Sequence, residues 1–260
     1  MPERSGFAAG VPSWTDVTVP DLEAGKAFYG GLFGWSFQTM PEDMGRYTTC
    51  EINGWRVAGM MPVGPDSDQP PRWSVYLATD DVDATASAVT AAGGSILMGP
   101  QDVPGEGRML YAADPTGAIV GFWQAGQTAG AQLVAEPGAM VWQQLATRDP
   151  QRADEFYRSL FSYDVQPMDG QVSDAATYAI AGSHVVSRMR MTEEWPADLG
   201  AHWMTFFSVS DTDMTAERAR TLGGSVVYGP VDSPHGRFAT VVDPFGAAFS
   251  VIVPTAGGGA

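Results

Sequence analysis

The feature that most constrains the fold of this chain is an internal repeat. The segment VPSWTDVTVPDLEAGKAFYGGLFGW, which starts at Val11, aligns with AMVWQQLATRDPQRADEFYRSLFSY, which starts at Ala139. Matched landmarks follow in the same order, at an offset of 128 to 130 residues: Trp14 with Trp142, Asp21 with Asp149, Phe28-Tyr29 with Phe156-Tyr157, Leu32-Phe33 with Leu160-Phe161, Trp73 with Trp203, Gly93-Gly94 with Gly223-Gly224, Gly99-Pro100 with Gly229-Pro230, and Asp114-Pro115 with Asp243-Pro244. A repeat of this length predicts one architecture built twice.

Each half contains a second, fainter repeat. Strand-like runs that lead into a helix behind a capping Asp recur about every sixty residues, at 15–29, 74–89, 143–157 and 205–219. Further strand-like runs follow each helix, and an Asp-Pro-x-Gly loop lies near the end of both halves. We therefore predict an α+β fold of four βαβββ units, arranged as two domains over residues 1–127 and 128–260.

The charge balance narrows the set of partners. The chain has 14 Lys and Arg against 30 Asp and Glu, a formal net charge of −16 at pH 7. This charge repels phosphate backbones and anionic lipid surfaces, and the N-terminal sequence has no apolar run typical of a signal peptide. We expect no nucleic-acid partner, no membrane partner and a cytoplasmic location, with which the single cysteine is compatible.

Cysteine and histidine are scarce in this chain. It has one cysteine, Cys50, and three histidines, His184, His202 and His235, all of them in the second half. These numbers exclude cysteine-rich zinc sites, disulfide frameworks and iron–sulfur clusters.

The landmarks together resemble the vicinal oxygen chelate superfamily, which includes glyoxalase I, the bleomycin-resistance proteins and the extradiol dioxygenases. The resemblance rests on paired βαβββ units, on strands that lead to FYxxLF helix ends, and on strand–DPxG–strand hairpins. These landmarks occur once in each half, so the resemblance covers almost the whole chain. It is strongest to two-module actinobacterial members. It implies that each half forms a U-shaped mixed sheet around a cavity, in which the catalytic members of the superfamily hold a divalent metal ion.

The resemblance also implies which positions would carry the metal ligands. These positions are Trp14, Gly59, Ser74 and Gly121 in the first half and Trp142, Ser187, Met204 and Ser250 in the second. None of these residues is His, Glu or Asp, whereas a divalent ion needs several imidazole or carboxylate donors. We therefore expect no catalytic metal and no cofactor in either half.

The residues that face the two cavities follow from the two-residue period of a strand. With the implied ligand positions taken as inward, the inward set is Trp14, Asp16, Met61, Tyr76 and Trp123 in the first half, and Trp142, Gln144, Met189, Phe206 and Ile252 in the second. Aromatic and thioether side chains of this kind suit a flat, hydrophobic, polyketide-like ligand. The alternative is that these aromatic residues simply fill a core or plug a closed cavity.

A few polar residues are candidates for chemistry. Asp16, on the inward face, and His235 could act as a general acid or base. Arg108 and Arg237 could place a guanidinium group near a cavity mouth, where it would meet a carbonyl or enolate oxygen. The alternatives are an exposed loop histidine and surface arginines that start strands. Tyr47, with its neighbour Arg46, is a candidate gate residue near a strand edge.

Three hypotheses of function follow. The first is a metal-free protein, acting as a monomer or homodimer, that binds a hydrophobic aromatic small molecule in resistance or sequestration. The second is a metal-independent tailoring enzyme for an aromatic natural product, catalysing a hydroxylation or rearrangement step. The third is a degenerate glyoxalase-like protein whose surface binds another protein.

Overall fold

The computed structural model describes residues 4–64, 70–168 and 174–255. The first half contains β1 (Pro12–Val19), α1 (Leu22–Phe33), β2 (Ser36–Thr39), the 3₁₀ turn η1 (Glu42–Met44), β3 (Thr48–Ile52), β4 (Trp55–Pro62), β5 (Trp73–Ala78), α2 (Val82–Ala91), β6 (Ser95–Val103), β7 (Gly107–Ala113) and β8 (Ile119–Ala125). The second half contains β9 (Met140–Thr147), α3 (Pro150–Phe161), β10 (Asp164–Pro167), β11 (Ala175–Ile180), β12 (Ser183–Arg190), β13 (His202–Ser208), α4 (Thr212–Thr221), β14 (Ser225–Ser233), β15 (Gly236–Val242) and β16 (Ala248–Pro254).

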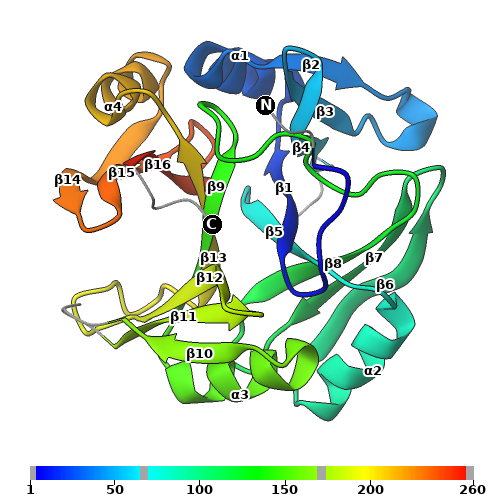
Figure 1. The fold of residues 1–260 in the computed structure, drawn as a ribbon. Helices are drawn as coiled ribbons and strands as arrows, with labels where there is room; N and C mark the ends of the chain where they lie inside the picture. The colour runs from blue at the N-terminus through cyan, green and yellow to red at the C-terminus, as the bar shows by residue number, and fades with distance from the viewer. Residues whose placement is uncertain (1–3, 65–69, 169–173, 256–260) are drawn as a thin grey trace.

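The strands form two mixed sheets of the same topology. Their strand orders are β2-β3-β4-β1-β5-β8-β7-β6 and β10-β11-β12-β9-β13-β16-β15-β14, so each sheet has eight strands and belongs to one half of the chain. Figure 1 shows that each sheet is strongly curved, with its open side turned away from the other sheet. The predicted α+β fold of tandem βαβββ modules is confirmed.

Each helix begins at the aspartate that the sequence pattern assigns to it. The side chain of Asp21 accepts hydrogen bonds from the backbone N–H groups of Glu23 and Ala24, and Asp81 caps α2 in the same way. Asp149 and Asp211 accept a backbone N–H at the starts of α3 and α4. Such a cap stabilises a helix by about 1 kcal/mol.

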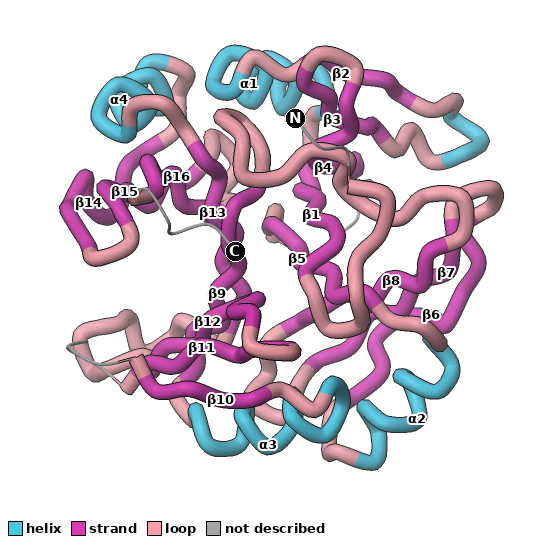
Figure 2. Tube along the Cα trace, in the orientation of Figure 1, coloured by secondary structure: helices cyan, strands magenta, loops and turns pink. Residues whose placement is uncertain are grey.

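The two modules share their hydrophobic cores. One core joins Tyr29 of α1 to Phe207 and Phe249 of the second module. The other joins Val89 of α2 to Tyr157 of α3. In Figures 1 and 2, α1 lies beside α4 at one end of the molecule and α2 beside α3 at the other. Neither module therefore completes its own core.

A hydrogen-bonded chain crosses the boundary between the modules twice. The indole N–H of Trp73 donates to the hydroxyl of Tyr29 at 3.1 Å, and this hydroxyl donates to Asp243 Oδ2 at 2.8 Å. In the repeated copy, Trp203 donates to Tyr157 at 3.0 Å, and Tyr157 donates to Asp114 Oδ2 at 3.0 Å. The contact between the modules therefore uses three landmarks of the repeat: the tyrosine of the FY pair, the tryptophan and the aspartate of the DPxG loop.

We expect Tyr157→Phe to lower the free energy of unfolding by about 1 to 3 kcal/mol. The substitution leaves the ring in place but removes the side-chain donor of Asp114 Oδ2, the only one among the described residues, and Asp114 is 3% exposed. Urea unfolding at neutral pH measures the loss. Tyr228→Phe is the matched control, because Tyr228 is 57% exposed. Equal stabilities of the two variants would contradict the role assigned to this contact.

Candidate functional site

The face of each sheet that points away from the helices is its concave face. On the first sheet, Asp16 lies opposite Gly59 of β4 and Ser74 of β5. Paired residues in a sheet point to the same side, so these residues share the first concave face with Trp14 and Tyr76, which lie opposite each other. The alternating residues, such as Val17, belong to the core under the helices.

Asp16 is the centre of a hydrogen-bonded cluster on the first concave face. Its Oδ2 accepts the hydroxyl of Tyr76 at 2.8 Å and, more weakly, that of Tyr47 at 3.4 Å. The indole N–H of Trp14 donates to the Tyr47 hydroxyl at 2.8 Å. The hydroxyls of Tyr76 and Tyr111 are hydrogen-bonded to each other. Four aromatic side chains therefore converge on one carboxyl group.

The electrostatic state of Asp16 is unusual for an aspartate. Burial raises its pKa to about 6, although the hydrogen bonds from Tyr76 and Tyr47 oppose the shift. The second carboxyl oxygen, Oδ1, is buried and has no hydrogen-bond partner among the residues that the structure describes. Burial also raises the pKa of Tyr76, which therefore remains a donor. A buried carboxyl group that titrates near neutral pH is suited to exchange a proton.

Small residues make room for this cluster. A Cβ atom at Gly59 would overlap the hydroxyl of Tyr47, and one at Gly121 would overlap the ring of Tyr76. Both glycines stand at positions where the family resemblance implies metal ligands. Two of the four implied ligand positions of the first module therefore lie under tyrosine side chains.

The residues of the first concave face do not fit a divalent metal ion. Asp16 offers one carboxylate, but neighbouring Trp14, Ser74, Gly59 and Gly121 supply no second charged or imidazole ligand. Within residues 4–64, 70–168 and 174–255, no three His, Cys, Asp or Glu side chains lie close enough to hold an ion. The chemistry available here is hydrogen bonding, aromatic contact and proton transfer.

We expect Asp16→Asn to stabilise the protein at pH 8 by about 2 to 3 kcal/mol and to have little effect at pH 4. Because the folded-state pKa of Asp16 is raised, the folded state binds this proton more tightly than the unfolded state. That contribution to stability is present below the unfolded-state pKa and is lost as the pH rises through about 6. Denaturant unfolding at several pH values measures it, and a gain that does not change with pH would contradict the assignment.

The second concave face has a different chemistry at the same positions. Gln144 lies opposite Ser187 and Met204, and Trp142 lies opposite Phe206. The Ser187 hydroxyl accepts the indole N–H of Trp142 at 2.8 Å and the amide of Gln144 at 3.2 Å. These residues are neutral, and all except Ser187 are half-buried.

The two concave faces also differ in how open they are. Asp16, Ser74 and Tyr76 are 2%, 5% and 5% exposed. Their counterparts Gln144, Met204 and Phe206 are only half-buried. The second concave face is therefore the more accessible to a ligand.

The remaining residues of the predicted inward set differ in exposure. Met61 is 36% exposed, while Ile252 is buried. Met189 is half-buried. Trp123 is half-buried and donates its indole N–H to the carbonyl of Thr128 at 2.9 Å. Trp123 thus holds the start of the segment that connects the modules.

The structure corrects the predicted position of the two arginines. Arg108 forms ion pairs with Asp83 of α2 and, at 2.9 Å, with Asp102. Arg237 pairs in the same way with Asp213 of α4 and, at 3.1 Å, with Asp232. Since α2 and α4 cover the opposite side of the sheets, neither guanidinium group lies at a concave face. The strands place these residues one step out of phase with the inward set.

His235 also lies apart from the Asp16 cluster. It is an exposed residue in the turn between β14 and β15, where its backbone N–H donates to the Ser233 hydroxyl at 3.2 Å. The structure therefore does not bring His235 and Asp16 into one acid–base pair.

Tyr111 is a residue of the Asp16 cluster that the sequence analysis did not predict. Its alternation with Met109 along β7 is the signal that could have found it.

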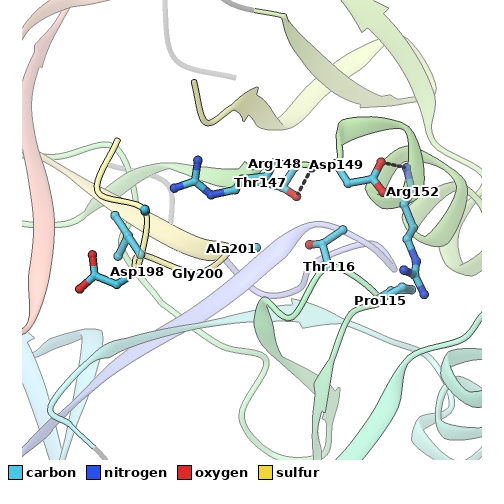
Figure 3. A pocket seen from close by; sticks show the side chains of 11 residues that line it. Pro115, Thr116, Thr147, Arg148, Asp149, Arg152, Asp198, Gly200 and Ala201 are labelled. Carbon is cyan, nitrogen blue, oxygen red and sulfur yellow. Dashed lines mark hydrogen bonds between the residues drawn. The ribbon is translucent and has the colours of Figure 1, made fainter. Parts of the chain in front are cut away.

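A separate cleft of about 350 Å³ opens where the two modules meet. Figure 3 shows its lining, which comes from the turn before β8, from the end of β9 and start of α3, and from residues 197–201. Its rim residues Arg148, Asp149 and Arg152 are exposed. In Figure 3 the two guanidinium groups point in different directions, so they do not converge on one ligand group.

Comparison with known families agrees with this geometry. The model of the Glyoxalase/Bleomycin resistance protein/Dioxygenase superfamily matches residues 12–122. A second model, the Glyoxalase-like domain, matches residues 140–252. The chain belongs to the glyoxalase/bleomycin resistance protein/dioxygenase superfamily, with one such domain in each half.

The relatives extend over the full tandem arrangement. Putative glyoxylase CFP32 of Mycobacterium tuberculosis is 39% identical over 259 residues, which cover 98% of both chains. Anthracycline biosynthesis protein DnrV of Streptomyces peucetius is 38% identical over 275 residues, again with 98% of both chains covered. The Mn(II)-bound glyoxalase from Novosphingobium aromaticivorans shares the fold, with a TM-score of 0.65 at 18% identity, over 95% of this chain and 84% of that one.

Among the described residues, no helix combines the length and the apolar character that crossing a bilayer requires.

Proposed function

We propose that the chain binds a flat, hydrophobic aromatic small molecule on the second concave face without a bound metal ion, in a resistance or sequestration role. The observation that carries this proposal is the chemistry of that face. Half-buried Trp142, Phe206 and Met189 provide aromatic and thioether contacts. Such side chains bind flat apolar rings through stacking and adaptable packing.

Polar groups on the same face can orient the ligand. Ser187 accepts hydrogen bonds from both Trp142 and Gln144, so its own O–H is left to donate to an oxygen of the ligand. Gln144 retains its amide oxygen as an acceptor. A polycyclic ring system with carbonyl and hydroxyl groups at its edge matches this combination.

The relatives support the same class of ligand. One of them is described as an anthracycline biosynthesis protein and covers nearly the full length of this chain. Anthracyclines are polycyclic aromatic molecules with oxygen substituents. The proposed ligand class for this chain is therefore an aromatic polyketide or a molecule of similar shape.

The proposal is tested by titrating the protein with an anthracycline and with 1,4-dihydroxyanthraquinone, following the fluorescence of the tryptophans and the ligand. We expect saturable binding of the unchanged ligand, with the same affinity in the presence of EDTA. Binding that requires an added divalent metal would overturn the metal-independent mode. No binding of any aromatic probe would favour the third hypothesis, a protein-interaction role.

A tailoring enzyme is a second candidate function, and the state of Asp16 favours it. A buried carboxyl group with a free oxygen and a pKa of about 6 is suited to general acid–base catalysis. Mass spectrometry of the incubated ligand distinguishes the two functions. Catalysis predicts a product of changed mass or retention time and its loss in Asp16→Asn, whereas binding alone predicts the unchanged ligand with both proteins.

A further inference from the structure

We propose that Tyr47 is a gate over Asp16, and that the position of its hydroxyl takes a ring hydroxyl of a small aromatic molecule when the gate opens. The site is the first concave face, so the proposal does not depend on the ligand of the second face. In the structure described here, the phenol of Tyr47 occupies the position itself.

The hydrogen bonds of Tyr47 define what this position accepts. Its hydroxyl accepts the indole N–H of Trp14 at 2.8 Å and donates to Asp16 Oδ2 at 3.4 Å. A replacing group must therefore both accept and donate a hydrogen bond, as a hydroxyl does. The bond to Asp16 is long at 3.4 Å, whereas Tyr76 donates to the same oxygen at 2.8 Å. A ligand hydroxyl that is free of the Tyr47 backbone can approach closer or reach the unpartnered Oδ1.

The room for the ligand is the volume of the phenol ring. Tyr47 is half-buried and lies over Gly59, where a Cβ atom would overlap its hydroxyl. The carbonyl of Tyr47 accepts the backbone N–H of Met40 at 2.9 Å, so the main chain is held while the side chain rotates. Residues 41–46 next to it are exposed, so an outward rotation carries the ring toward solvent.

The second module shows what the absence of a gate does. By the offset of the repeat, Ala175 stands where Tyr47 stands, because Ala175 pairs with Met189, the counterpart of Met61. A methyl group cannot cover the sheet as a phenol does. The second concave face accordingly has half-buried Gln144, whereas its counterpart Asp16 is buried. This difference between the repeats thus contributes to the closed first face.

The test is calorimetric titration of Tyr47→Ala with phenol and with toluene, which has nearly the same size and no hydroxyl. We expect Tyr47→Ala to bind phenol at least about tenfold more tightly than the native protein does, and to prefer phenol over toluene by about tenfold, as a hydrogen bond to a carboxyl group allows. Thermal unfolding confirms that the variant is folded. A folded Tyr47→Ala protein that binds no phenol, or that binds toluene equally well, would overturn the proposal.

A second variant tests where the phenol hydroxyl lies. In the double variant Tyr47→Ala, Gly59→Ala the added methyl group at residue 59 stands where the Tyr47 hydroxyl stands in the native protein, so it blocks a ligand hydroxyl there. We expect this double variant to lose the gain in phenol affinity that Tyr47→Ala shows. Equal phenol affinity in Tyr47→Ala and in the folded double variant would place phenol elsewhere and overturn the proposal. Titration of the anthracycline at the second face should be the same in all three proteins.

Discussion

Replacing Trp142 with alanine is expected to weaken binding of an anthracycline by about tenfold to a hundredfold. The indole provides the largest aromatic surface among the residues of the second concave face that we propose to bind the ligand. It also donates to Ser187 at 2.8 Å, and so helps to orient the hydroxyl that would meet the ligand. Titration that follows the fluorescence of the ligand measures the change.

Trp55→Ala is the matched control for this prediction. Trp55 starts β4 and is 39% exposed, so its loss removes the same side chain from a position outside the second face. We expect the affinity of Trp55→Ala for the anthracycline to stay within about twofold of that of the native protein. An equal loss of affinity in the two variants, or no loss in Trp142→Ala, would place the ligand elsewhere.

Phe207→Ala is expected to lower the free energy of unfolding by about 3 to 5 kcal/mol. Phe207 is fully buried, and its ring lies 5.0 Å from that of Phe33 and 4.9 Å from that of Trp73, both in the first module. The cavity would open in a core that both modules share. Equilibrium unfolding in guanidinium, followed by tryptophan fluorescence and by circular dichroism, measures the effect.

The same experiment tests whether the modules unfold together. We expect one transition in both probes, because each core contains residues of both modules. Val227→Ala, at a residue that is 60% exposed, should change stability by less than about 0.5 kcal/mol. Two separate transitions in the native protein, or a loss below about 1 kcal/mol in Phe207→Ala, would contradict the shared core.

Much of the fold could be predicted from local patterns that repeat. Alternating strands followed by a capping aspartate identified the starts of all four helices, since Asp21, Asp81, Asp149 and Asp211 act through contacts within a few residues. The matched landmarks predicted the doubling of the module. Such signals survive in the sequence because the interactions that produce them are local.

The site could be predicted only in part. Asp16 and Tyr76 were placed on one face by their alternation along two strands, and the structure joins them by a hydrogen bond of 2.8 Å. Alternation along β7 places Tyr111 on the face of Met109, but the contact of Tyr111 with Tyr76 depends on the order of the strands in the sheet. The arginines are a different case: Arg108 is one residue out of phase with the inward set, so it lies on the helix-covered side, where its partner Asp83 belongs to α2.

The repeat in the amino-acid sequence is enough to show that one architecture occurs twice, because a repeat depends only on residue identity and order. Together with the family resemblance, it also predicts that aromatic, small or thioether residues stand at the implied metal-ligand positions. Only the assembled fold shows that the modules share their cores through contacts such as Tyr29 with Asp243, and that Asp16 on the first concave face is buried while its counterpart Gln144 on the second is half-buried. These features arise from side chains far apart in the chain, such as Tyr47 over Gly59, whose packing becomes defined only when the strands are assembled.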